Sequence, residues 1–322
     1  MAGVRYTRTG FADLAGWADD DHQAALDVFG LTRGTLPETW PDLPHPGQTA
    51  RSYFEDRFIP VVIEDGAPML FTGYYEPELD ASPEPDDTHR FPAYAVPPDL
   101  EPGKPYLSRR DIEEKQTLAG RGLELAWFAD PVDLFFLQVQ GSGRIRFPDG
   151  RRIRLGFAAK NGHPYTSIGR LLVSKGVLSE DQVSPDAIRG WVTAQGAAGR
   201  AFLWQNESFV FFRRIDDVPG TQGPPGALGA PVTAGRTLAV DPGATPLGAP
   251  VWIETAGATP IHRLMVAQDV GSAIKGAQRA DVFFGTGDTA GRAAGALNCG
   301  GRMITLMPHA MADRLAGDVQ HA

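Results

Sequence analysis

Three aspartates in the last third of the chain stand beside apolar runs that are bounded by glycine. Asp241 closes the run LAV, Asp269 follows a run that begins at Met265, and Asp281 opens the run VFF. Such runs predict short buried strands. Burial raises the pKa of a carboxyl group, so that it holds a proton near neutral pH, as a general acid must. The pattern therefore predicts acid catalysis.

Two other properties of these residues bear on that hypothesis. Aspartate is also common at strand ends because it stabilises turns. Lys275 and Arg279 lie close to the acids in sequence, and a nearby cation would lower a carboxyl pKa. The sequence leaves open whether burial or these cations dominate. Asp288 is a further acid, which we interpret as the cap of a helix over 289–297.

The composition predicts a water-soluble folded protein with many turns. The 322 residues carry a net charge of −9 and have a mean hydropathy of −0.21, which gives no electrostatic reason to bind nucleic acid. The chain has no apolar run of eighteen residues, so we expect no transmembrane span. The single Cys299 excludes an intramolecular disulfide. The scattered histidines and the absence of HExxH and CxxC predict no metal site and no cofactor.

Several blocks of sequence resemble the membrane-bound lytic murein transglycosylase A (MltA) family, in that family's order. The blocks are FTGYYEPEL (71–79), FFLQVQGSGRIRFPDG (135–150), GFAAKNGHPYTSIGRLL (156–172) and WQNESFVFFR (204–213), followed by VDPGATPLGAPVWIE, AQDVGSAIKG and RADVFFGTG around the three aspartates. The resemblance covers roughly residues 50–308. It implies a mainly β fold with α elements, in which a double-psi β-barrel carries a smaller inserted β-rich domain and a cleft separates them.

Shifts in composition predict where the insertion begins and ends. Residues 80–103 are acidic and rich in proline, and residues 215–230 are rich in glycine and proline. We therefore expect a discontinuous catalytic domain, made of 1–79 and 216–322, with the three-aspartate segment at about 231–308. The inserted MltA-type domain would comprise 80–215.

The family resemblance implies non-hydrolytic cleavage of the β-1,4 bond between N-acetylmuramic acid and N-acetylglucosamine in peptidoglycan. Asp281 would be the single acid and then the base, and 1,6-anhydro ends would form. Asp269 would support it, and Asp241 would have a weaker supporting or structural part. Two alternatives stay open: an inverting glycoside hydrolase on the same barrel, and a non-catalytic glycan-binding protein.

The residues that we expect to bind glycan come from the family-like blocks. Aromatic rings stack on sugars, amides bind hydroxyl and N-acetyl groups, and glycine turns expose backbone donors, although the tyrosines are also plausible core residues. The candidates are Tyr74, Tyr75, Gln138, Gln140, Gly141, Ser142, Lys160, Asn161, Tyr165 and Gly285. Four arginines on one face of a predicted hairpin (144, 146, 152 and 154) are either solvated or meet substrate carboxylates.

Local patterns predict the remaining elements. We expect a helix capped by Asp21, a helix over 51–58, strands over 58–65 and 71–75, and helices capped by Ser108, Ser167 and Ser184. The segment 131–140 is so apolar and β-prone that we predict a strand, with Gln138 and Gln140 on one face. A hairpin should close at Asp149-Gly150. We expect His22 and His45 to be solvated, and we give His163 no catalytic role.

The sequence also suggests where the protein works. The N-terminal residues have no apolar export segment, no cleavage site and no lipobox cysteine, and we favour removal of an export signal. We therefore expect a periplasmic protein whose native precursor has an outer-membrane anchor. Expected partners are peptidoglycan glycan strands, with other cell-wall enzymes as further candidates, and we expect a monomer.

Overall fold

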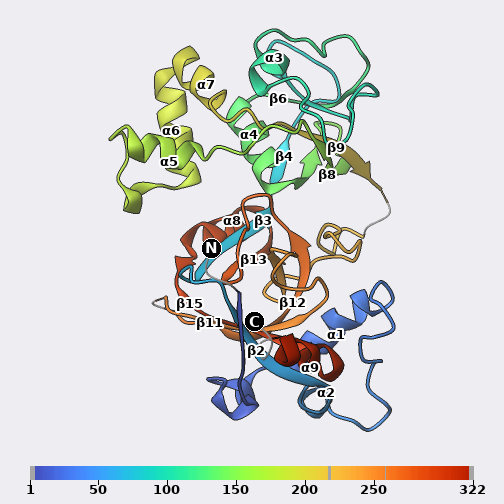
Figure 1. Ribbon diagram of the computed structural model, residues 1–322. Coiled ribbons are helices and arrows are strands. Elements are labelled where there is room, and N and C mark those ends of the chain that lie inside the picture. Colours follow the sequence, from blue (N-terminus) through green and yellow to red (C-terminus); the bar gives the residue numbers. More distant parts are fainter. Residues whose placement is uncertain (1–3, 217–218, 258, 319–322) are drawn as a thin grey trace. The chain divides into compact units, whose positions relative to one another are not determined.

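The computed structural model of the chain describes residues 4–216, 219–257 and 259–318 (Figure 1). The chain forms two compact units. The first unit comprises Met1–Tyr75, Pro219–Gly285 and Thr289–Ala322, and the second comprises Glu76–Val218 and Thr286–Asp288. No helix in the described part of the chain is long and apolar enough to cross a membrane.

A nine-stranded mixed sheet dominates the first unit. Its spatial order is β1-β2-β15-β11-β12-β10-β13-β3-β14. The central strands are short and buried, as their apolar sequences predict, and β10 pairs with β12 in parallel but with β13 in antiparallel orientation. The strands are β1 (Arg5–Arg8), β2 (Phe58–Glu64), β3 (Leu70–Glu76), β10 (Thr237–Val240), β11 (Pro250–Thr255), β12 (His262–Val270), β13 (Arg279–Thr286), β14 (Asn298–Cys299) and β15 (Gly301–Pro308).

Four α-helices accompany this sheet in the described residues. They are α1 (His22–Arg33), α2 (Ala50–Arg57), α8 (Gly287–Ala296) and α9 (His309–Asp318). The predicted cap of α1 is confirmed, since the Asp21 carboxylate accepts the Ala24 amide at 3.0 Å. Asp288 lies in the first turn of α8 instead of capping it, where a negative charge still favours the helix dipole.

The expectation that His22 is solvated is wrong. Its side chain is buried, and its ring meets the Trp17 ring edge-on with centroids 4.4 Å apart. Trp17 in turn packs against Trp252 in the largest hydrophobic core. The histidine is buried because it begins the helix whose apolar face forms this core.

The second unit has a four-stranded sheet, a separate pair of strands and several helices. The sheet order is β4-β7-β8-β9, and β5 pairs with β6. The strands are β4 (Glu78–Asp80), β5 (Phe91–Tyr94), β6 (Glu124–Phe128), β7 (Ser142–Arg146), β8 (Arg152–Lys160) and β9 (Val210–Ile215). The helices are α3 (Arg109–Glu113), α4 (Pro131–Gln140), α5 (Ile168–Ser174), α6 (Pro185–Gln195) and α7 (Ala197–Leu203). The predicted caps of α3, α5 and α6 are confirmed.

The predicted strand over 131–140 is wrong, because this segment is helix α4. The Asp130 carboxylate caps its first turn, and Gly141 ends it at φ 80°. Val132 and Phe135 pack into one hydrophobic cluster, whereas Leu134 and Leu137 pack into another. A helix buried on two sides has no polar stripe, so its sequence resembles that of a buried strand. Consequently, Gln138 and Gln140 do not share a strand face.

The predicted hairpin is confirmed, with Arg144 opposite Arg154 and Arg146 opposite Arg152. However, the four arginines are not a uniformly solvated face. Arg154 is buried, and its Nε lies 2.7 Å from Oε1 of the fully buried Glu76. The buried carboxylate supplies the counter-charge that lets an arginine leave water.

Candidate active site

Sheet register places two of the three predicted aspartates in one row of the first unit. Ala239 of β10 lies opposite Asp269 of β12 on one side and opposite Asp281 of β13 on the other. Residues that are directly opposite each other on neighbouring strands project from the same face of a sheet. The two carboxyl groups are therefore presented on one face, two strand spacings apart.

Asp281 is held by a chain of two hydrogen bonds. The Thr72 hydroxyl, on β3, donates to Oδ1 of Asp281, and it accepts a hydrogen bond of 2.9 Å from Nη2 of Arg279. Burial raises the pKa of Asp281, whereas the Thr72 hydroxyl and the Arg279 guanidinium lower it, and the net pKa lies above its usual value. Burial therefore outweighs the cation, which the sequence left open. The result is an oriented carboxyl group with a raised proton affinity.

Asp269 is bound through both of its carboxyl oxygens. Its Oδ2 accepts the Tyr74 hydroxyl at 2.9 Å, and its Oδ1 accepts the backbone amides of Val270 at 2.9 Å and Ala227 at 3.1 Å. Burial raises the pKa of Asp269 to about 6, and the charge of Asp281 adds to the increase. Burial also raises the pKa of Tyr74 well above its usual value. The tyrosine therefore remains a donor to this carboxylate.

Asp241 has a different environment at the end of β10. Its oxygens accept the amides of Gly243 at 3.1 Å and Gly276 at 2.9 Å, and Lys275 lies 3.9 Å away. These contacts tie the turn after β10 to the loop before β13.

Small residues let the surrounding strands and helix approach closely. A Cβ atom on Gly73 would lie 2.6 Å from the Ala294 Cα of α8, and one on Gly291 would lie 2.8 Å from the Tyr75 ring. Gly285 adopts a φ of 107°, which disfavours a side chain. The half-buried Tyr75 therefore lies against α8, and Gly285 provides the backbone turn where β13 ends.

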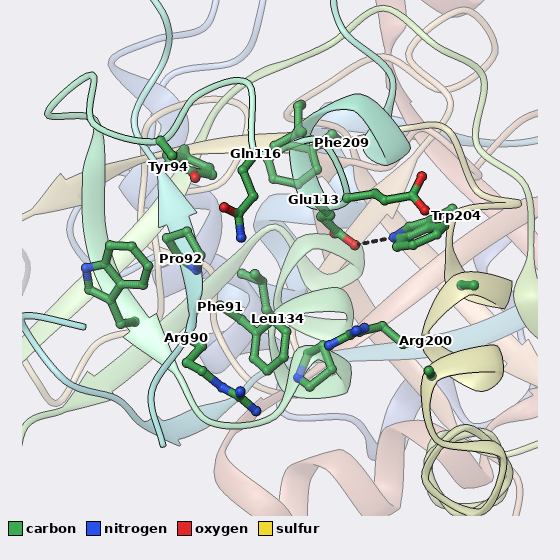
Figure 2. A pocket seen from close by; sticks show the side chains of 17 residues that line it. Arg90, Phe91, Pro92, Tyr94, Glu113, Gln116, Leu134, Arg200, Trp204 and Phe209 are labelled. Atoms are coloured by element: carbon green, nitrogen blue, oxygen red, sulfur yellow. Dashed lines mark hydrogen bonds between the residues drawn. The ribbon is translucent and has the colours of Figure 1, made fainter. Parts of the chain in front are cut away.

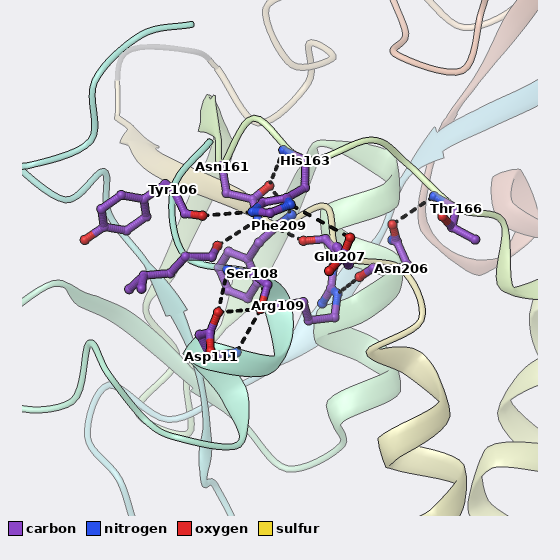
Figure 3. A network of polar contacts seen from close by, with 11 residues as sticks. Tyr106, Ser108, Arg109, Asp111, Asn161, His163, Thr166, Asn206, Glu207 and Phe209 are labelled. Carbon is purple, nitrogen blue, oxygen red and sulfur yellow. Dashed lines mark hydrogen bonds and ion pairs between the residues drawn. The ribbon is translucent and has the colours of Figure 1, made fainter. Parts of the chain in front are cut away.

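Two of the predicted glycan-binding side chains are engaged inside the second unit. Figure 3 shows Asn161 within a polar network, where its amide nitrogen donates to the carbonyl oxygens of Leu107 and Glu207 at 2.9 and 2.8 Å. Its carbonyl oxygen accepts the Phe209 amide at 2.8 Å. The Gln138 Oε1 accepts Nη2 of the buried Arg109 at 2.6 Å. Both side chains thus stabilise the fold of this unit.

The other candidates in the second unit have solvent-accessible positions. Gln140, Gly141 and Ser142 lie where α4 turns into β7, and Lys160 is exposed at the end of β8. Tyr165 is 39% exposed. These residues therefore lie at least partly at the surface of the second unit.

Sequence reasoning missed Thr72, which contacts the proposed acid directly. A signal was present, because Thr72 and Tyr74 alternate along β3 and therefore share a face. Each donates to a different aspartate. Among the described residues, no group of three or more His, Cys, Asp or Glu side chains could hold a metal ion.

Comparison with known proteins identifies the family. The family model described as the MltA specific insert domain matches residues 70–213, and the 3D domain model matches residues 236–307. The crystal structure of a membrane-bound lytic murein transglycosylase from Agrobacterium tumefaciens is 34% identical, with a TM-score of 0.85, over 96% of this chain and 99% of that chain. This chain belongs to the MltA family. The resemblance predicted from sequence is confirmed.

Other members of the MltA family show the same similarity. MltA from Neisseria gonorrhoeae, in its monoclinic form, has a TM-score of 0.79 at 33% identity and covers 97% of this chain and 95% of its own. The structure of Escherichia coli MltA with bound chitohexaose has a TM-score of 0.75 at 29% identity, over 89% of this chain and 90% of that chain. Membrane-bound lytic murein transglycosylase A of Vibrio cholerae is 33% identical over 249 residues, which are 74% of this chain. The chain spans 65% of the length of that curated relative.

Proposed function

We propose that this protein is a lytic transglycosylase that cleaves the MurNAc-β-1,4-GlcNAc bond of peptidoglycan and leaves 1,6-anhydro ends. The main support for the proposal is the half-buried Asp281 carboxyl group, which is oriented by Thr72 and has a raised pKa. Family members are named lytic murein transglycosylases, and one of their structures holds chitohexaose. That substrate class agrees with an acid that acts on a glycosidic oxygen.

In the proposed reaction Asp281 acts twice. Its proton passes to the glycosidic oxygen while the C1–O bond breaks and positive charge develops on the sugar ring. The resulting carboxylate then accepts the proton of the C6 hydroxyl, whose oxygen bonds to C1 and closes the anhydro ring. Because the nucleophile belongs to the substrate, no separate carboxylate has to activate water. The Thr72 hydroxyl would hold the carboxyl group in position for both steps.

The hydrogen bonds of Asp269 favour this reaction over the alternative of an inverting hydrolase. An inverting enzyme needs a second carboxylate that binds and deprotonates a water molecule. Both oxygens of Asp269 already accept hydrogen bonds from Tyr74 and from two backbone amides. We therefore assign Asp269 a supporting role and Asp241 a structural one. Substrate contacts are proposed for Tyr75, Gln140, Ser142, Lys160 and Tyr165.

The domain assignment is also part of the proposal. We infer a catalytic domain over 1–79 and 216–322 that contains a double-psi β-barrel, and an inserted domain over 80–215. The parallel β10–β12 pair beside the antiparallel β10–β13 pair supports a barrel with crossed connections. We further propose that the protein acts outside the cytoplasm, because peptidoglycan, its proposed substrate, lies there. Its curated relatives are named membrane-bound.

Mass analysis of muropeptides released from purified peptidoglycan tests the reaction. The wild type should release products that are one water lighter than those of lysozyme, and Asp281→Asn should lower the rate by about 10²–10⁴-fold. The matched control is Asp288→Asn, which neutralises an exposed acid and should keep the activity. Water-added products would establish the hydrolase, and a folded wild type that binds glycan without releasing products would establish the binding module.

Replacing the orienting hydroxyl tests the hydrogen-bonded chain. Thr72→Val should lower kcat by about 10- to 100-fold, because a hydrogen bond to a charged group contributes about 1.5–3 kcal/mol. The Thr72 hydroxyl lowers the pKa of Asp281, so its loss should move the alkaline limb of the pH–rate profile to higher pH. Thr72→Ser should restore both properties. An unchanged profile in Thr72→Val would contradict the assignment.

A further inference from the structure

The second unit contains a cavity that the proposed reaction does not use. Its volume is about 610 Å³, which lies within the range of about 300–1,000 Å³ typical of small-ligand sites. Strands β5 and β6, helices α3, α4 and α7 and the segment after α3 all contribute to its wall. Five aromatic side chains contribute to the lining: Phe91, Tyr94, Trp127, Trp204 and Phe209. The cavity therefore offers aromatic surface beside polar and charged groups.

The acidic and the basic residues that line this cavity differ in whether they form ion pairs. Glu113 accepts Nη1 of Arg109 at 2.7 Å and the Trp204 indole at 3.0 Å, and Glu114 is likewise paired with an arginine outside the lining. By contrast, Arg90 and Arg200 are exposed and have no carboxylate partner among the described residues, although Arg200 lies over the Phe91 ring at 5.8 Å. The available charge in the cavity is therefore positive.

Gln116 has an unusual conformation in the same wall. It is the one non-glycine residue with a positive φ, 52°, among those that the structure describes. Such a conformation is costly for glutamine and is found most often where the surrounding structure requires it, as at binding sites. Figure 2 shows its amide between Tyr94 and Leu134, pointing into the space that the labelled side chains surround. An amide offers both a donor and an acceptor.

We propose that this cavity binds the free carboxylate end of a short peptide. Arg90 and Arg200 lie on either side of Phe91 in Figure 2, and guanidinium groups bind carboxylates through paired hydrogen bonds. The amide of Gln116 matches a peptide group, and the aromatic walls match apolar side chains. The peptide is either a stem attached to glycan or a soluble fragment released by another hydrolase.

The site rests on residues of the second unit alone, so it is tested without any assay of cleavage. The probe is diacetyl-L-Lys-D-Ala-D-Ala as the free acid, compared with its C-terminal amide, in isothermal titration calorimetry with the whole chain. The free acid should bind at least about tenfold more tightly than the amide. Equal affinities, or no saturable binding of either form, would overturn the proposal.

Variants locate the site. The double variant Arg90→Gln and Arg200→Gln should weaken binding of the free acid by about tenfold or more, whereas Arg152→Gln should not, since it removes an exposed arginine of β8 outside the cavity. Gln116→Gly should weaken binding while the unfolding midpoint stays the same or rises, because glycine tolerates the positive φ. Wild-type affinity in the double variant would place the ligand elsewhere.

A final comparison identifies the source of the peptide. A disaccharide-peptide and the same peptide without sugar are titrated into the wild type and into the double arginine variant. Tighter arginine-dependent binding of the disaccharide-peptide would support a glycan-attached stem, and equal arginine-dependent binding would support a soluble peptide. If both ligands bind the double arginine variant as tightly as the wild type, the proposed site would be refuted.

Discussion

Ionisation of Asp269 should destabilise the folded protein, and Asp269→Asn should relieve that cost. The pKa of Asp269 rises from 3.8 to about 6 in the folded chain because of burial. At about 1.36 kcal/mol for each pKa unit, ionisation costs the folded state about 3 kcal/mol. Asparagine keeps an oxygen for the Val270 and Ala227 amides, and its amino group can donate to the Tyr74 hydroxyl. The substitution thus removes the charge, and each of these three partner groups keeps a hydrogen bond to residue 269.

The sign of the pH dependence follows from proton linkage. The folded pKa is the higher one, so the folded state binds more protons between pH 3.8 and about 6 and loses stability as the pH rises through that interval. The asparagine variant lacks this loss. The difference in free energy of unfolding between this variant and the wild type should therefore depend on pH. We expect the two proteins to be about equally stable at pH 4, and the variant to be more stable by about 2–3 kcal/mol at pH 8.

Guanidinium denaturation followed by tryptophan fluorescence, at pH values from 4 to 8, measures this difference. The matched control is Asp241→Asn, whose carboxylate accepts backbone amides at the end of β10. We expect no comparable stabilisation there at high pH. A pH-independent difference for Asp269→Asn, or a destabilised variant at pH 8, would refute the reasoning that burial of this carboxyl group sets its pKa.

Two further substitutions test the packing around the site. Gly73→Ala should destabilise the protein by about 1–3 kcal/mol in chemical denaturation, because the new Cβ atom would lie 2.6 Å from the backbone of α8. The control is Gly295→Ala, which should be neutral or stabilising because the added Cβ atom would meet open space. An unchanged free energy of unfolding in Gly73→Ala would show that α8 can shift to accommodate the added methyl group. Glu76→Gln should cost about 3–5 kcal/mol, because it removes the buried carboxylate that pairs with the buried Arg154. Asp80→Asn, whose arginine partner is exposed, should cost less than about 1 kcal/mol, and equal losses in the two variants would argue against the buried pair.

Much of the local structure could be predicted because it depends on neighbouring residues. Caps such as Asp21 and Ser184 satisfy amides within one turn, and the Asp149-Gly150 turn closes its own hairpin. These contacts need no information from distant parts of the chain. The apolar runs around the aspartates likewise indicated strands. The family resemblance rested on the order of the sequence blocks along the chain.

The spacing of apolar residues did not predict the secondary structure correctly where an element is buried on more than one side. Helix α4 lies between two hydrophobic clusters, so its residues show neither a polar stripe nor strand alternation. The same limit applies to His22 and to Arg154, whose burial depends on what packs against them. A residue's own sequence neighbours do not specify its distant packing partners.

The sequence by itself determined the chemical types: acids beside apolar runs, with glycine where strands and helices approach closely. The tertiary structure decided which groups meet. Thr72 contacts Asp281 across 209 residues, and Tyr74 contacts Asp269 across 195. The pairing of these distant strands also determines that burial raises the pKa of Asp281 by more than Arg279 lowers it. The physical reason is that proton affinity depends on solvent exclusion and on distances between charges, which the chain acquires when its distant strands pair.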